Sequence, residues 1–169
     1  TIYSAVKHMM EGHKKGQRAV SLEDPIEYPL ACMSQVEVAI HKGLTFDSLL
    51  SNVLRQDAEI IVIGEIRDEA TAGIALRATL TGHLILSTLH CATAAEAPRR
   101  LIDLQGDPSL VAEAISAVLS QRLVRKICPR CKTLYEGKGE DPPLPGPPNF
   151  ERHYYGQGCP YCLYTGYYG

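Results

Sequence analysis

The sequence has no long apolar run and no excess of charge of one sign. No stretch approaches the ~18 consecutive apolar residues that a membrane-spanning helix needs, so a membrane-spanning protein is not expected. The 169 residues carry 17 lysines and arginines against 19 aspartates and glutamates, which gives a formal net charge of −2. This near-neutral balance argues against a protein that binds nucleic acid through bulk electrostatics.

Targeting and repeat signals are missing as well. The first residues, Thr1 to Ser4, contain no basic segment leading into an apolar one, so no secretory signal is predicted. No internal repeat of about 20 to 50 residues is present, so a repeat architecture is not indicated. The chain opens without a methionine and in a helical pattern, and we expect it to be part of a longer protein.

The six cysteines fall into two groups. Cys32 and Cys91 stand alone and are expected to be small apolar or surface side chains. The other four form two Cys-x-x-Cys pairs, which in a chain without an export signal indicate a metal site and a reducing compartment rather than three disulfides. Four thiolates suit a closed, structural Zn²⁺ site, with a disulfide or redox pair as the alternative. The predicted ligands are Cys128, Cys131, Cys159 and Cys162.

Apolar spacing predicts strands that alternate with helices over most of the chain. The run at residues 60–64 is continuous and mostly β-branched, which is typical of a central strand covered on both faces. The alternation indicates an α/β fold with a mostly parallel sheet and flanking helices. The expected strands lie at 18–22, 34–40, 60–64 and 83–88, and the expected helices at 1–15, 45–55, 68–80, 94–104 and 110–123.

The composition changes towards the end of the chain. Residues 141–148 contain five prolines and are expected to form a loop or an extended linker. Seven of the nine tyrosines lie at residue 135 or later. We therefore expect an α/β core at 1–126 and a small tetracysteine module at 127–169 that is cut short at its C-terminal end.

Two acidic segments follow predicted strands. Glu65 comes directly after the buried strand and Gly64, so it is expected at the carboxyl edge of the sheet, where ligands bind and a carboxylate can orient water or hold Mg²⁺. Glu23, Asp24 and Glu27 follow an earlier strand, and a divalent cation would offset their mutual repulsion. The plain alternatives are a solvated glutamate and a solvated acidic turn.

Two histidines, His83 and His90, bracket the strand predicted at 83–88. They lie at its opposite ends, so one or both can reach an edge of the sheet. A histidine near phosphate can respond to the phosphate charge. Taken singly, each is more often a surface or core histidine.

Together these segments resemble the motifs of the secretion ATPase superfamily, which comprises type II secretion and type IV pilus assembly ATPases, with pilus retraction ATPases as near relatives. Residues 22–28 are similar to the family's Asp box, 60–68 to its atypical Walker B strand and 81–90 to its His box. Segments 54–57 and 120–125 also match, and the order of the motifs is the family's order. The resemblance implies a RecA-like P-loop NTPase core that hydrolyses ATP with Mg²⁺.

The resemblance also implies roles for single residues. Glu65 would be the Walker B glutamate that polarises the attacking water, and His90 would support the same edge. Arg55 would contact phosphate and His83 would sense the γ-phosphate. The acidic residues that would surround the Mg²⁺ are Glu23, Asp24 and Glu27.

The sequence departs from the family pattern at two important places. It contains no G-x-x-x-x-G-K-[S/T] loop (Walker A), so the lysine and amides that hold the β- and γ-phosphates are missing. We expect that loop to end just before Thr1, and the chain alone to bind ATP poorly or not at all. Ser51 stands where many relatives carry an arginine, whose contribution must be absent or come from elsewhere.

The resemblance extends to the cysteine module and to partners. Secretion and assembly ATPases carry a tetracysteine module and retraction ATPases generally lack one, which favours the assembly and secretion side. The family implies a homohexamer at the cytoplasmic face of the bacterial inner membrane. Its partners would be the inner-membrane platform and cytoplasmic components of a secretion or pilus machine, with no nucleic acid.

Two alternatives stay open. A zinc-dependent interaction module on a degenerate, non-hydrolysing NTPase-like core would account for Ser51 and for the missing loop. A zinc ribbon that binds nucleic acid would account for the basic residues near the first cysteine pair, although the net charge and the ATPase motifs weigh against it. Those basic residues are Arg122, Arg125, Lys126, Arg130 and Lys132.

Overall fold

The computed structural model describes residues 1–12, 16–135 and 153–168. The chain divides into two compact units, Thr1–Ser120 and Gln121–Gly169. This division falls a few residues before the boundary predicted between residues 126 and 127. The proline-rich segment at 141–148 and the end of the first predicted helix at 14–15 lie outside the described residues.

The first unit is built on a four-stranded parallel sheet. Its strand order is β2-β1-β3-β4, and Val62 of β3 pairs with Ser21 of β1 on one side and with Leu86 of β4 on the other. Because all four strands run in the same direction, their carboxyl ends meet at one edge. The strands are β1 (Ala19–Glu23), β2 (Ser34–Glu37), β3 (Ile60–Ile63) and β4 (Leu84–Ser87).

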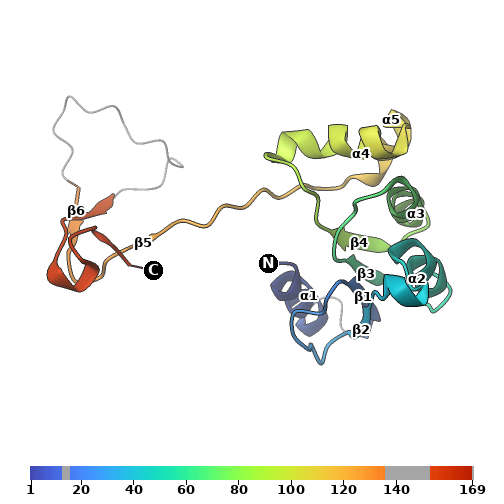
Figure 1. Ribbon diagram of the computed structural model, residues 1–169, viewed down its shortest axis with the longest axis horizontal. Helices are drawn as coiled ribbons and strands as arrows, with labels where there is room; N and C mark the ends of the chain where they lie inside the picture. The colour runs from blue at the N-terminus through green and yellow to red at the C-terminus, as the bar shows by residue number, and fades with distance from the viewer. Residues whose placement is uncertain (13–15, 136–152, 169) are drawn as a thin grey trace. The chain divides into compact units, whose positions relative to one another are not determined.

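One face of this sheet is covered by α1 (Ile2–Glu11), as Figure 1 shows. Val6 of α1 is fully buried and joins Ala19, Ile60 and Val62 in an apolar cluster. Successive residues of a strand point to opposite sides of the sheet, so the strand residues that alternate with Ala19, Ile60 and Val62 lie on the other face.

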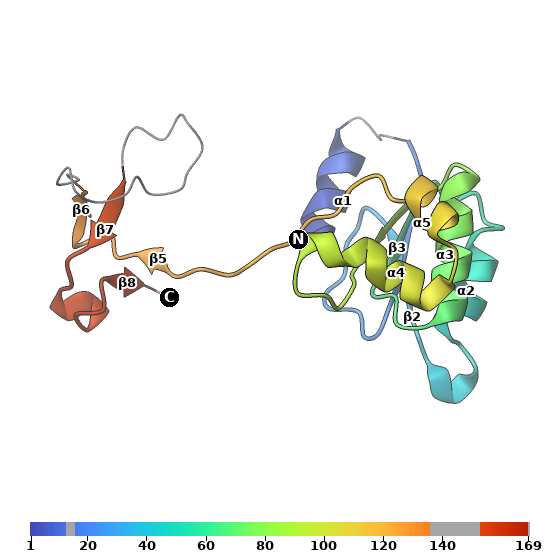
Figure 2. The ribbon, with the colours of Figure 1, turned by 90° about the horizontal axis from the view of Figure 1, so that it is seen from above.

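The larger core lies on that other face. Leu22, Ile61 and Ile63 are fully buried there, and Figure 2 shows α5 beside α3, which it contacts. The covering helices are α2 (Phe46–Val53), α3 (Glu69–Leu80), α4 (Ala97–Gln105) and α5 (Pro108–Ala114), with the 3₁₀ helices η1 (Ile40–Lys42) and η2 (Ala94–Glu96) in the connections. Among the described residues, no helix combines the length and the apolar character needed to cross a membrane.

The start of α3 follows directly from the sequence. The Asp68 carboxylate accepts a hydrogen bond from the Thr71 amide at 2.8 Å and so satisfies a free N–H of the first turn. Small buried residues, Ala72 and Ala75 among them, let the helix pack closely on the core. This fixes the loop between β3 and α3, which contains Glu65.

The helix predicted at 110–123 is wrong in its extent. α5 ends at Ala114, and Ile115 already has an extended backbone. Residues 115–125 form no helix, and Leu119, Leu123 and Val124 are 78%, 94% and 84% exposed. A short helix is marginally stable unless its apolar face packs, and in the described structure these side chains have no such surface.

The second unit consists of two small antiparallel strand pairs. β5 (Lys126–Ile127) pairs with β8 (Tyr167–Tyr168), β6 (Lys132–Leu134) pairs with β7 (Tyr154–Gly156), and η3 (Pro160–Cys162) precedes β8. Gly156 and Gly166 approach so closely that a Cβ on Gly156 would overlap the Gly166 carbonyl oxygen. Among the described residues of this unit, the buried apolar side chains are Cys128 and Cys162, so the unit has little core besides its cysteines.

Candidate functional site

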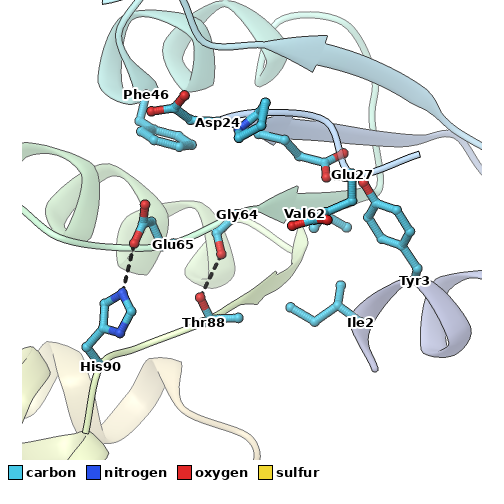
Figure 3. A pocket seen from close by; sticks show the side chains of 12 residues that line it. Ile2, Tyr3, Asp24, Glu27, Phe46, Val62, Gly64, Glu65, Thr88 and His90 are labelled. Atoms are coloured by element: carbon cyan, nitrogen blue, oxygen red, sulfur yellow. Dashed lines mark hydrogen bonds and ion pairs between the residues drawn. The ribbon is translucent and has the colours of Figure 1, made fainter. Parts of the chain in front are cut away.

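A cavity of about 220 Å³ opens at the carboxyl edge of the parallel sheet (Figure 3). It is lined by residues that end or follow β1, β3 and β4, together with Ile2 and Tyr3 of α1 and Phe46 of α2. Five of the seven residues predicted to contact nucleotide, Mg²⁺ or the attacking water line this one cavity. They are Glu23, Asp24, Glu27, Glu65 and His90.

Glu65 lies just past the end of β3 with its side chain 13% exposed. Its Oε2 accepts hydrogen bonds from Arg67 Nε at 2.5 Å and from His90 Nε2 at 3.0 Å. Partial burial opposes ionisation, but the hydrogen bonds from His90 and Arg67 outweigh it and lower the pKa of Glu65. Glu65 is therefore an ionised, oriented hydrogen-bond acceptor at neutral pH. Thr88 donates to the Gly64 carbonyl oxygen at 2.7 Å and ties the loop after β4 to the same point.

Replacing Arg67 with methionine should weaken the pH dependence of stability. A carboxylate whose folded pKa is lowered stabilises the fold above its unfolded pKa of about 4.3, and that contribution is lost as the pH falls through the folded value. Because Arg67 is 66% exposed, we expect the variant to lose less than about 1 kcal/mol of stability at neutral pH, and this difference to shrink as the pH falls below the unfolded pKa of Glu65. Urea unfolding of Arg67→Met and of the exposed control Arg99→Met across this range measures the effect. An Arg67→Met chain with unchanged pH dependence would contradict it.

Glu23 is the most buried carboxylate of the cavity, at 5% exposure. Its Oε1 accepts from Ser21 Oγ at 2.5 Å and from Gln35 Nε2 at 3.1 Å, and its Oε2 accepts from the Tyr3 hydroxyl. Burial and the adjacent Glu23 carboxylate raise the pKa of Tyr3 to about 12, so Tyr3 stays protonated as a donor. The buried charge is thus satisfied by neutral donors, as a buried carboxylate requires.

Asp24 and Glu27 are exposed and lie at the rim of the same cavity, beyond the end of β1. With Glu23 and Glu65 they present carboxylate oxygens, the ligand type that Mg²⁺ prefers directly or through its bound waters. Among the described residues these oxygens do not come together closely enough to hold an ion by themselves, so a divalent cation here would be held mainly through its waters and phosphate groups.

Arg55 and His83 lie at the opposite edge of the sheet. Arg55 is exposed in the loop before β3, where Arg18 donates to the Gln56 carbonyl at 3.0 Å. His83 precedes β4, and its Nδ1 is 3.1 Å from the Ala78 carbonyl oxygen. A four-residue strand is roughly 13 Å long, so within one chain the structure does not bring these two residues to the cavity that holds Glu65. Their contacts with phosphate stay predictions.

The sequence analysis missed four residues that hold the two central carboxylates. Ser21 carried a usable signal, because a strand residue two positions before Glu23 shares its face. Arg67 is also two residues from Glu65, but both lie in the loop after β3, where strand spacing gives no signal. Tyr3 and Gln35 reach Glu23 only through the packing of α1 and the pairing of β2 with β1, which spacing along the chain does not reveal.

The four predicted cysteine ligands converge in the second unit. All four Sγ atoms lie within 4.8 Å of one another, with Cys128 and Cys159 at 3.9 Å, Cys131 and Cys162 at 3.8 Å, and Cys159 and Cys162 at 3.7 Å. A tetrahedral Zn²⁺ with bonds of about 2.3 Å has sulfur–sulfur edges of about 3.8 Å. A disulfide needs about 2.05 Å, so these distances fit a metal and not a disulfide.

The ionisation of the cluster also favours a cation. Burial opposes ionisation of Cys162, but the backbone amides of Cys159 and Gly166 lower its pKa to about 6. Burial raises the pKa of Cys131 to about 12, and hydrogen bonds with the neighbouring cysteines add to this. A Zn²⁺ bound among the four sulfurs would favour the thiolate form that metal binding requires.

Known proteins resemble this chain along its whole length. The family model for the type II/IV secretion system protein matches residues 1–169. The type II secretion system protein HxcR of Pseudomonas aeruginosa is 40% identical over 169 residues, covering 100% of this chain and 32% of HxcR. The type IV pilus assembly ATPase PilB of Thermus thermophilus is 42% identical over 173 residues, covering 100% of this chain and 19% of PilB.

Among solved structures, the crystal structure of the pilus retraction motor PilT with bound ADP has a TM-score of 0.64 and 30% identity, covering 75% of this chain and 39% of PilT. With the parallel sheet and its flanking helices, this likeness confirms the predicted α/β, RecA-like core. The chain spans about a third or less of the two curated relatives compared above.

Proposed function

The chain belongs to the type II/IV secretion system protein family, and on that premise we propose that it is the catalytic part of an ATP-driven motor for type II secretion or type IV pilus assembly. One observation carries the proposal. Three separate segments, namely the acidic residues within 23–27, Glu65 and His90, meet at one cavity. That cavity lies at the carboxyl edge of the parallel sheet, where such folds bind ligands.

In the proposed reaction, water attacks the γ-phosphorus of ATP while Glu65 accepts a hydrogen bond from that water. The bond from the γ-phosphorus to the bridging oxygen breaks, and ADP, inorganic phosphate and a proton are released. Its lowered pKa keeps Glu65 ionised for this task, and His90 and Arg67 hold its carboxylate in one orientation. Mg²⁺ bound with ATP would neutralise phosphate charge. The residues that would hold it, directly or through water, are Glu23, Asp24 and Glu27.

Arg55 and His83 lie at the edge of the sheet opposite to the cavity of Glu65. They would therefore contact a nucleotide that is bound by a neighbouring subunit. A homohexamer with active sites near the subunit boundaries would provide that geometry. Arg55 would then spread and stabilise developing negative charge, which its planar guanidinium suits.

For the second unit we propose a structural Zn²⁺ held by Cys128, Cys131, Cys159 and Cys162. The sulfur spacing and the lack of another apolar core support this role. Both HxcR and PilB match over the whole chain, residues of the cysteine module included, and their names refer to secretion and pilus assembly, which favours these two roles. The motor would work at the cytoplasmic face of the inner membrane with the platform of its machine.

Phosphate release tests the proposal in the protein encoded with the residues upstream of Thr1. We expect ATP hydrolysis that requires Mg²⁺ and stops when EDTA is added. A folded, zinc-loaded protein without turnover would instead favour the interaction module on a degenerate core. Salt-sensitive DNA binding would favour the zinc ribbon.

A further inference from the structure

The hydrogen bonds to the Glu23 carboxylate limit the positions at which it can accept a hydrogen bond from a ligand. A carboxylate has about four acceptor positions, and protein donors fill three of those on Glu23. Ser21 and Gln35 occupy Oε1, and the Tyr3 hydroxyl occupies one position of Oε2. Since Glu23 is 5% exposed and lines the cavity, the position on Oε2 that no described residue occupies is its route to a ligand.

Gln35 contacts both the Glu23 carboxylate and the Tyr3 hydroxyl. Its Nε2 lies 3.1 Å from Glu23 Oε1 and 3.2 Å from the Tyr3 hydroxyl oxygen, and its Oε1 accepts from the Leu30 amide at 2.6 Å. The Leu30 contact fixes which end of the amide donates. Gln35 is also the register partner of Ser21, so β2 and β1 present both donors side by side.

Tyr3 comes to the same carboxylate from α1, across the sheet face that α1 covers. Figure 3 shows its ring extending from the helix to the cavity with the hydroxyl at the sheet edge. The Tyr28 ring packs edge-on against it, with centroids 4.7 Å apart, and limits its rotation. A shift of α1 would therefore move a donor of Glu23.

We propose that Tyr3 and Gln35 are positioning residues that fix Glu23 so that its open Oε2 position accepts a hydrogen bond from a water of the Mg²⁺ shell. This inference rests on the proposed ATPase function. Glu23 then acts through water, while the exposed Asp24 and Glu27 stay free to move with the cation. Ser21 is the third donor to Glu23, but it lies on the same strand as Glu23, so a shift of α1 would not move it.

The test uses Tyr3→Phe and Gln35→Met in the protein encoded with the residues upstream of Thr1. Each keeps the size of the side chain and removes the donor. We expect the Mg²⁺ concentration for half-maximal activity, and the Mn²⁺ dissociation constant measured by electron paramagnetic resonance with ADP present, to rise about 10- to 100-fold. Nucleotide affinity without metal and the melting temperature serve as readouts of the fold.

Two comparisons separate positioning from general damage. Ser4→Ala and Ser34→Ala change the exposed neighbours of the two residues and should leave every readout at wild-type values. In a Glu23→Gln background, Tyr3→Phe and Gln35→Met should have little further effect on Mn²⁺ binding, because they act through the same carboxylate.

The outcomes distinguish this inference from the proposed function. Wild-type metal affinity in both variants, with an active wild-type protein, would overturn the positioning role and leave the ATPase proposal standing. Full, additive losses in the Glu23→Gln background would overturn it too. A wild-type protein that neither binds nucleotide nor hydrolyses it would overturn both.

Discussion

Glu65→Gln should reduce ATP turnover by at least about 100-fold while leaving nucleotide binding near the wild-type level. The amide keeps the shape of the side chain but lacks the charge that accepts a proton or orients water. The loss should appear in kcat, since Glu65 acts on the attacking water and not on the nucleotide. The measurement is steady-state phosphate release, with nucleotide affinity determined separately, in the protein that includes the residues upstream of Thr1.

Glu69→Gln is the matched control for this variant. Glu69 is an exposed carboxylate in the first turn of α3, four residues further along, and does not line the cavity. Its turnover should stay within about twofold of wild type, since surface changes of this kind have small effects. Turnover at the wild-type level in Glu65→Gln would remove Glu65 from the role of catalytic carboxylate.

Removal of zinc should unfold the second unit and spare the first. The purified, reduced chain should contain one Zn²⁺, and chelation or Cys128→Ser should release it. Structural Zn²⁺ contributes about 10–16 kcal/mol of apparent binding energy in small zinc domains, and the described part of this unit has little other core. Hydrogen exchange should therefore rise sharply in residues 121–135 and 153–168 and change little in β1, β3 and α3.

The lone cysteines provide the control. Cys32→Ser and Cys91→Ser remove thiols that lie outside the cluster and should keep one Zn²⁺ per chain. Freshly prepared reduced protein without zinc, or a chelated chain whose second unit keeps its protection, would refute a structural metal.

The sheet and its functional edge could be predicted because their signals are local. The apolar run at 60–64 gave β3 nearly to the residue, and a carboxylate that directly follows a parallel strand must lie at its carboxyl edge. Two Cys-x-x-Cys pairs predicted the cluster of four cysteines, because each pair supplies two thiols within four positions. In each case the chemistry is encoded within a few neighbouring positions.

Features that depend on packing between distant segments could not be predicted. The helix expected through residue 123 stops at Ala114, because amphipathic spacing does not say whether a partner surface exists. Tyr3 and Gln35 are ordinary in sequence, and only the sheet register and the position of α1 bring them to Glu23. The family motifs pointed to His83 without showing that it lies at the opposite edge from Glu65.

The central claim is that this chain holds the catalytic edge of a nucleotide site whose phosphate-binding loop is not among its 169 residues. Its most direct test compares Mg²⁺–ATP binding and hydrolysis by the chain alone and by the chain extended upstream of Thr1. We expect the extended protein to bind and hydrolyse ATP and the chain alone to do neither. Absence of binding and turnover in both, with the fold and the zinc intact, would contradict the motor and favour a degenerate core that serves as an interaction module.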